Sequence, residues 1–289
     1  NDPMPSRAPL VSTHKATSRQ VPIGGRDIYT LTLTPGDDPA VEGPWLVFLH
    51  EGLGCTAMWH DFPQRLAQAT GKPALIYDRQ GYGRSGPRRR PSTVGYLQEE
   101  AETILPALLD HFGIEAPFLI GHSDGGTIAL LFASRFRRRA AGVITEAAHV
   151  FVETVTLEGI RATRHAFEHG GLEDQLSRYH GTRTREMFYH WADVWLSAAF
   201  RDWNVEACLP LIRCAALVIQ GRDDPYGTVR QVEAIASGIG PRARSYLIPS
   251  CGHAPHREAP RRTLAAMRRF ILAARRPPDP VTPGRTAST

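Results

Sequence analysis

The chain has 289 residues, of which 42% are hydrophobic, and its formal net charge is +5 at pH 7. Such a chain can form a full core, so a wholly disordered protein is excluded. No stretch approaches the roughly 18 consecutive apolar residues of a membrane-spanning helix, and we therefore expect a soluble protein that contacts no membrane.

The positive charge comes almost entirely from arginine, because the only lysines are Lys15 and Lys72. Arginine runs at 88–90 and 137–139 could indicate nucleic-acid binding. No nucleic-acid-binding motif lies near either run, and both fall where solvated loops or helix ends are expected. We therefore expect no nucleic-acid partner, and the sequence leaves a homo-oligomer open. The four cysteines form no C-x-x-C pair, which favours a reduced, cytoplasmic setting.

Short apolar runs alternate along the chain with longer segments of helical period, which is typical of a mostly parallel sheet flanked by helices. The predicted strands cover residues 27–33, 45–50, 74–78, 118–121, 142–146, 216–220 and 243–248. The predicted helices cover residues 58–69, 94–111, 125–136, 228–237 and 260–274. Residues 1–20 and 276–289 are rich in Pro, Ser, Thr and Arg, so both ends are expected to be flexible.

One interval interrupts this alternation. Residues 151–212 contain no strand-like run but carry many aromatic and charged residues at helical spacing. Structureless loops of this length are rare in compact domains, so we expect a helical cap over one end of the sheet. Residues 21–150 and 213–275 would then form the core domain.

The sharpest local pattern is G-H-S-D-G-G at residues 121–126. It follows a predicted buried strand and opens a predicted helix, and a G-x-S-x-G in that context is typical of a turn that projects a nucleophilic serine from its apex. A serine hydroxyl becomes a good nucleophile only when a base takes its proton and a third group orients that base. We therefore predict Ser123 as the nucleophile.

Candidates for the other two roles follow later strands. Asp223 and Asp224 lie in the turn after strand 216–220, and His253 and His256 lie in the segment after strand 243–248. The remaining histidines are scattered along the chain, and the one pair at H-x-x-x-H spacing, His165 and His169, has no further histidine or cysteine close by in the sequence to complete a metal site. We therefore expect neither a metal nor a cofactor.

These motifs, with Y-D-R-Q-G-Y-G-R-S at residues 77–85, resemble the α/β-hydrolase superfamily in its capped, esterase- and lipase-like subset, over roughly residues 21–274. The resemblance implies an α/β-hydrolase fold with a helical cap. It favours Asp224 as the acid, because this position matches the G-x-x-D pattern of the family, and His253 as the base, because it follows Gly252. His256 is then interpreted as a surface or loop histidine without a catalytic role.

The resemblance also locates the expected oxyanion hole. One donor would be the backbone N–H of Asp124, which follows the nucleophile, and the second would be that of Gly52, in the loop of residues 50–55. Relatives commonly read His-Gly in this loop, whereas Glu51 here replaces the glycine.

Serine at the apex favours acyl chemistry, whereas haloalkane dehalogenases and epoxide hydrolases of this fold carry aspartate there. We therefore expect hydrolysis of a carboxylic ester or lactone of a small-molecule substrate, with a small or medium apolar group enclosed by the aromatic cap. Cap arginines (Arg161, Arg164 and Arg183) could meet an acidic substrate. The alternatives are a C–C bond hydrolase acting on ring-fission products, an aminopeptidase, a thioesterase, or a ligand-binding protein that has kept the fold without activity.

Overall fold

The computed structural model describes residues 14–36, 43–88 and 90–274. They form one eight-stranded sheet with strand order β1-β2-β4-β3-β5-β6-β7-β8. The strands are β1 His14–Ile23, β2 Arg26–Pro35, β3 Leu46–Leu49, β4 Ala74–Tyr77, β5 Phe118–His122, β6 Gly142–Glu146, β7 Ala215–Gly221 and β8 Ala243–Ile248. β1 and β2 pair antiparallel, as do β2 and β4, and the remaining pairs are parallel.

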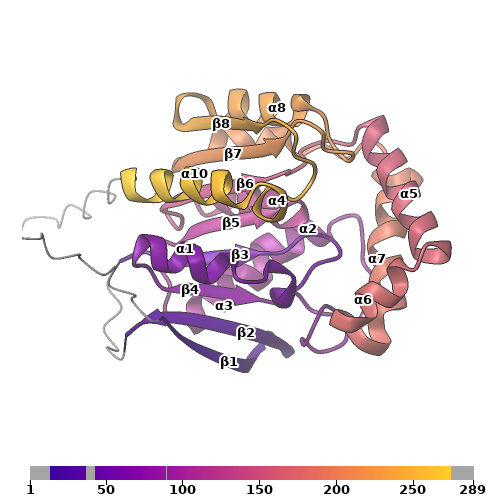
Figure 1. The fold of residues 1–289 in the computed structure, drawn as a ribbon, viewed down its shortest axis with the longest axis horizontal. Helices are drawn as coiled ribbons and strands as arrows, with labels where there is room; N and C mark the ends of the chain where they lie inside the picture. The colour runs from indigo at the N-terminus through magenta and orange to yellow at the C-terminus, as the bar shows by residue number, and fades with distance from the viewer. Residues whose placement is uncertain (1–13, 37–42, 89, 275–289) are drawn as a thin grey trace, which may run out of the picture.

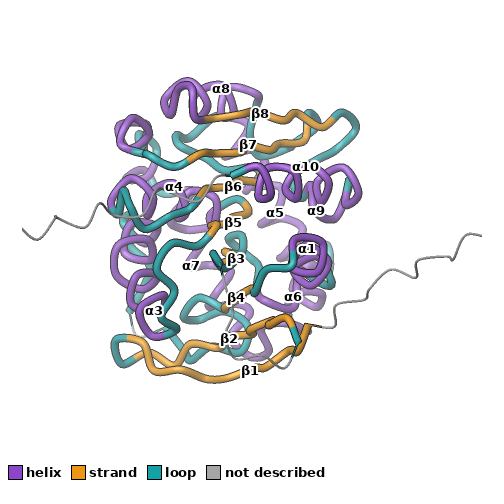
Figure 2. The backbone as a smooth tube through the Cα atoms, turned by 90° about the vertical axis from the view of Figure 1, so that its left-hand side faces the viewer, coloured by secondary structure: helices purple, strands orange, loops and turns teal. Residues whose placement is uncertain are grey.

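Helices cover both faces of the sheet. The α-helices of the described residues are α1 Phe62–Thr70, α2 Tyr96–Glu99, α3 Leu105–His111, α4 Asp124–Arg135, α5 Thr154–His169, α6 Leu172–His180, α7 Thr184–Leu196, α8 Val229–Ile239, α9 Pro255–Glu258 and α10 Pro260–Ala273, and a π-helical turn at Glu100–Ile104 joins α2 to α3. Figure 2 shows α1 and α10 on one side of the sheet and α3 and α4 on the other. Two apolar clusters fill the spaces between the sheet and these two layers.

β3 and β5 are apolar throughout or nearly so, and every residue in them and in β6 is buried. Strands covered by helices on both faces have this character, because neither side of the strand meets water. The predicted α/β-hydrolase fold is confirmed, and each predicted strand has a counterpart in the sheet.

The N-terminal segment differs from the expectation. Residues 14–20, predicted to be part of a flexible end, belong to the edge strand β1, which pairs with β2 along its whole length. Most of β1 is polar and exposed, because an edge strand meets the core only at a few positions such as Val21 and Ile23. Residues 1–13 and 276–289, also predicted to be flexible, lie outside the described residues.

Residues 151–212, predicted as a helical cap, contain α5, α6 and α7. These three helices lie together at one end of the sheet (Figure 1). A 3-10 helix at Glu206–Leu211 packs instead against α4 and α8 of the core. The loops that follow β3, β5, β6, β7 and β8 contribute residues to a cavity beneath the cap.

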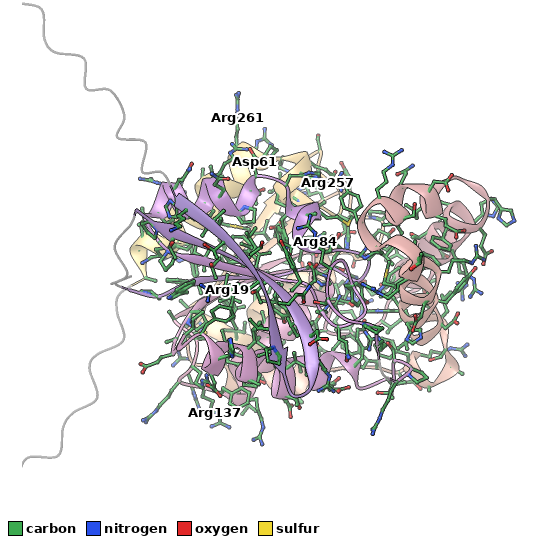
Figure 3. The ribbon with its side chains drawn as sticks, turned by 90° about the horizontal axis from the view of Figure 1, so that it is seen from below. Arg19, Asp61, Arg84, Arg137, Arg257 and Arg261 are labelled. Carbon is green, nitrogen blue, oxygen red and sulfur yellow. The ribbon has the colours of Figure 1, made fainter. Side chains whose placement is uncertain are left out.

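Arginines of the two runs lie at the surface where the structure describes them. Arg137, Arg138 and Arg90 are exposed, and Arg89 lies outside the described residues. Figure 3 shows Arg137 and Arg261 pointing away from the body of the protein on opposite sides. No helix of the described residues is long and apolar enough to cross a membrane.

Candidate active site

Ser123 occupies the turn between β5 and α4 with φ 52° and ψ −116°. A non-glycine residue at positive φ costs on the order of 1–3 kcal/mol, and such strain persists only where the surroundings impose it. Here the Ser123 N–H donates to the carbonyl of Glu146 at 2.8 Å, which ties the apex to β6. A side chain at Gly125 would collide with the backbone carbonyl of Leu49, so the turn requires glycine at that position.

His253 and Asp224 are joined by a direct hydrogen bond. Nδ1 of His253 lies 2.8 and 2.9 Å from Oδ1 and Oδ2 of Asp224, and Oδ1 also accepts the Tyr226 N–H at 2.8 Å. Burial alone would raise the pKa of Asp224, but the adjacent imidazole of His253 and its hydrogen bond lower it, so the carboxylate stays ionised. Asp223 is exposed and is joined to the histidine loop only by its backbone N–H.

Ser123 and His253 line the same cavity. Among the described residues, the Ser123 hydroxyl makes no hydrogen bond with a protein group, His253 included. Nδ1–H donation to Asp224 leaves Nε2 of His253 as the acceptor, which is the tautomer that a general base needs. Serine–histidine bonds are often long without substrate and tighten on binding, so this arrangement is compatible with proton transfer.

The cavity that Ser123 and His253 line has a volume of about 240 Å³ and lies between the cap and the carboxyl ends of the strands. Its wall on the cap side is mainly apolar and aromatic, and includes Ile160, Leu172, Leu176, Trp191 and Trp195. A pocket that is mainly apolar and carries few polar groups suits a small organic ligand.

The two predicted oxyanion donors also lie at this cavity, since Gly52 and Asp124 are among its lining residues. Within the described residues, neither backbone N–H donates a hydrogen bond to a protein acceptor. A side chain at Gly52 would collide with the indole of Trp191, which covers this residue from the cap. Gly52 lies one position later than the glycine of the usual His-Gly pattern. The close approach of the cap requires a glycine at this position.

The side chain of Asp124 points away from the cavity into a buried network that the sequence did not reveal. Its carboxylate lies 3.4 Å from Arg79 and accepts the Tyr96 hydroxyl at 2.7 Å. Arg79 also donates to the carbonyl of Glu51 at 2.8 Å, and the Trp195 indole donates to Tyr96 at 2.9 Å. The network therefore connects the serine turn, the 50–55 loop and the cap.

Glu51, the departure from the family pattern, forms an ion pair with His122. Nδ1 of His122 lies 3.4 Å from the Glu51 carboxylate, and its Nε2 donates to the carbonyl of His253 at 2.7 Å. Burial alone would lower the pKa of His122, but Glu51 raises it to about 9. Burial alone would raise the pKa of Glu51, but His122 holds it far below its usual range. The residue before the nucleophile thus links the 50–55 loop to the histidine loop.

His256 does not compete with His253 for the serine. It is buried in the short helix α9, where its N–H and Nδ1 lie 2.8 and 3.1 Å from the carboxylate of Glu146. The interpretation of His256 as a surface or loop histidine was therefore wrong, because the residue is buried in a helix.

The cap arginines do not line the cavity. Arg164 pairs with Glu168 and Asp193, and Arg183 donates to backbone carbonyls of the core. The arginine at the cavity is instead Arg257 of α9, which lies on the side of the core that faces the cap in Figure 3. Within the described part of the chain, no group of three or more His, Cys, Asp or Glu side chains could hold a metal ion.

Comparisons with known proteins agree with this fold. A model of the "Alpha/beta hydrolase family" matches residues 46–266. The chain is 25% identical over 262 residues to 2-succinyl-6-hydroxy-2,4-cyclohexadiene-1-carboxylate synthase of Klebsiella pneumoniae (strain 342), covering 84% of this chain and all of that protein. It is 23% identical over 268 residues to 2-hydroxy-6-oxo-6-phenylhexa-2,4-dienoate hydrolase of Burkholderia cepacia, covering 83% and 91%.

Among solved structures, the crystal structure of a membrane phospholipase A, a bacterial virulence factor, matches with a TM-score of 0.74 at 20% identity. The match covers 92% of this chain and 88% of that one. The family match extends over most of the core and the whole cap. The chain therefore belongs to the α/β-hydrolase family.

Proposed function

We propose that the protein is a serine hydrolase that cleaves a carboxylic ester or lactone through an acyl-enzyme. The observation that carries this proposal is the common cavity of Ser123, at its strained apex, and His253, which is bonded to the buried carboxylate of Asp224. A nucleophile, a base and a group that orients the base are the three parts that acyl transfer by serine requires.

In this mechanism Nε2 of His253 takes the Ser123 hydroxyl proton while the oxygen attacks the substrate carbonyl carbon. The N–H groups of Gly52 and Asp124 stabilise the resulting oxyanion. The intermediate collapses as the imidazolium gives its proton to the leaving oxygen, which departs as an alcohol or, from a lactone, stays attached to the acyl chain. The same imidazole then deprotonates a water molecule, and attack of that water releases the acid and restores Ser123.

The shape and lining of the cavity favour a substrate with one small or medium apolar group. The aromatic wall formed by Trp191 and Trp195 would enclose this group beneath the cap, while the reacting carbonyl lies against Gly52. Other cap aromatics pack on one another instead: Phe188 stacks on Phe167 with ring centroids 3.8 Å apart.

A second candidate is hydrolysis of a C–C bond in an acidic ring-fission product. It is favoured by the likeness over most of both chains to the dienoate hydrolase and by Arg257 at the cavity, whose guanidinium could meet a substrate carboxylate. Glu51 at the same cavity is held in an ion pair with His122, so the two side chains together carry no net charge toward such a group.

A substrate panel separates these functions. Nitrophenyl esters with acyl chains of increasing length, lactones and a vinylogous diketone acid should be offered to the wild type and to Ser123→Ala. We expect hydrolysis of short and medium esters or lactones, and a loss of several orders of magnitude in Ser123→Ala with an unchanged circular dichroism spectrum. Turnover of the diketone acid alone would select the second candidate, and undiminished turnover in Ser123→Ala would refute both.

A further inference from the structure

His180, the last residue of α6 in the cap, is bonded through both ring nitrogens to the backbone of the core. Nδ1 lies 2.9 Å from the Gly83 nitrogen and Nε2 lies 2.9 Å from the Leu53 carbonyl oxygen. The Gly83 N–H can only donate, so Nδ1 accepts, and Nε2 must carry the proton that it donates to Leu53. The contact therefore requires one neutral tautomer of a side chain that is only 2% exposed.

Leu53 directly follows Gly52, the candidate oxyanion donor. The cap contacts both residues, since Trp191 of α7 covers Gly52 and His180 bonds to Leu53. Arg183 adds a further anchor to the turn that carries Gly83, where it donates to the carbonyls of Gly83 at 2.9 Å and of Ser85 at 2.8 Å. The position of the 50–55 loop thus depends on cap residues that lie more than a hundred positions away in the sequence.

We propose that His180 is a positioning residue for the oxyanion hole: its hydrogen bond to Leu53 holds the cap side of the 50–55 loop and, together with the contacts that His50 and Arg79 make to the Glu51 carbonyl, places the Gly52 N–H. This inference rests on the proposed serine hydrolase function. Oxyanion donors act on the charge that develops in the transition state and bind the ground-state substrate weakly. Loss of the bond should therefore lower kcat and leave KM nearly unchanged.

The surroundings of His180 favour the tautomer that the contact needs. Burial lowers the pKa of His180, and the charge of Arg183 acts in the same direction, whereas hydrogen bonding to Leu53 and the carboxylates of Asp78 and Glu51 oppose it. The imidazole of His50 and the ring of Tyr82 also face it from the core. At neutral pH the ring is thus neutral and both hydrogen bonds form, while protonation would direct an N–H at the Gly83 N–H.

Two substitutions separate positioning from packing. His180→Phe keeps a ring but removes both hydrogen bonds, and His180→Gln offers an amide that can donate to Leu53. We expect kcat for the best ester substrate to fall about ten- to hundredfold in His180→Phe, less than the roughly 10²- to 10³-fold loss on removing one oxyanion donor, because the donor is displaced and not removed. KM should change by less than about threefold, and His180→Gln should recover a large part of kcat.

His190→Phe is the matched control. His190 is also a cap histidine bonded to a core backbone, with Nδ1 3.3 Å from the Ser92 nitrogen, but Ser92 lies outside the 50–55 loop. Its kcat should stay within about twofold of the wild type, as expected when no oxyanion donor is affected.

Different results reject different statements. If the wild type hydrolyses no ester or lactone, the proposed function fails. If it does, but folded His180→Phe keeps the wild-type kcat, or if only KM changes, the role of His180 is wrong and the proposed function stands. Should His180→Phe not fold, His180→Leu, which also removes both hydrogen bonds, takes its place in the same comparison with His180→Gln.

Discussion

Arg79 and Asp124 form a buried ion pair beneath the serine turn, with 3.4 Å between the guanidinium and the carboxylate and side chains only 4% and 1% exposed. Removing one partner of such a pair leaves an uncompensated buried charge, which costs about 3–5 kcal/mol. We predict that Arg79→Met lowers the free energy of unfolding by about that amount, measured by urea denaturation. Arg137→Met, at an exposed arginine, should change it by less than about 0.5 kcal/mol. Equal effects of the two substitutions would show that the pair does not stabilise the fold.

The ion pair between Glu51 and His122 predicts a dependence of stability on alkaline pH. The pKa of His122 is raised from 6.5 to about 9 in the folded protein, so the folded state holds a proton that the unfolded state has lost in this range. The stabilisation that protonated His122 gives to the folded state is therefore complete below pH 6.5 and disappears as the pH rises through about 9. In Glu51→Gln the partner charge is absent, and this part of the decline should vanish or move to lower pH.

Thermal unfolding of the wild type and Glu51→Gln across this range is the measurement. Curves of Tm against pH with the same shape for both proteins would contradict a charged His122 held by Glu51.

The two adjacent aspartates should differ sharply in their effect on turnover. Asp224→Asn keeps the shape of the side chain but favours the wrong tautomer of His253, which in serine triads lowers kcat by about 10⁴-fold. Asp223→Asn changes an exposed side chain without a hydrogen bond to His253, so its kcat should stay close to the wild type. Steady-state kinetics on one ester decide between them, and a larger loss in Asp223→Asn would reverse the assignment.

The cysteines next to the site should react slowly with alkylating agents. Burial raises the pKa of Cys55 to about 12 and that of Cys251 to about 11, and both thiols are covered. Since the thiolate is the reactive form, we expect iodoacetamide at neutral pH to leave the activity of the folded enzyme unchanged. Mass spectrometry should find both residues unmodified, and rapid loss of activity with labelling of either one would contradict this.

The sequence predicted the elements whose signal is local. Buried parallel strands such as β3 and β5 are short apolar runs, and the serine turn carries its glycines within six residues. Asp224 and His253 followed strands whose carboxyl ends must meet at one edge of a parallel sheet. The pairs of candidates that contain them could therefore be predicted once those strands were recognised, and the family resemblance chose one member of each pair.

Long-range pairings could not be predicted in this way. His180 and Trp195 belong to cap helices. In the sequence of these helices, a histidine or aromatic residue that packs on its neighbours cannot be distinguished from one that hydrogen-bonds to the core. Glu51 and His122 were visible beside recognised motifs, but their pairing depends on the side-chain directions of two separate loops. β1 was missed because a polar edge strand carries few of the apolar residues on which strand prediction depends.

Covalent labelling of Ser123 tests the central claim most directly. A fluorophosphonate reacts with a serine hydroxyl only when a neighbouring base activates it, so the folded wild type should incorporate one label per chain, located on the peptide that contains Ser123. Ser123→Ala should remain unlabelled, and His253→Ala should react far more slowly. A wild type that takes no label, or labelling that persists unchanged in Ser123→Ala, would contradict the account.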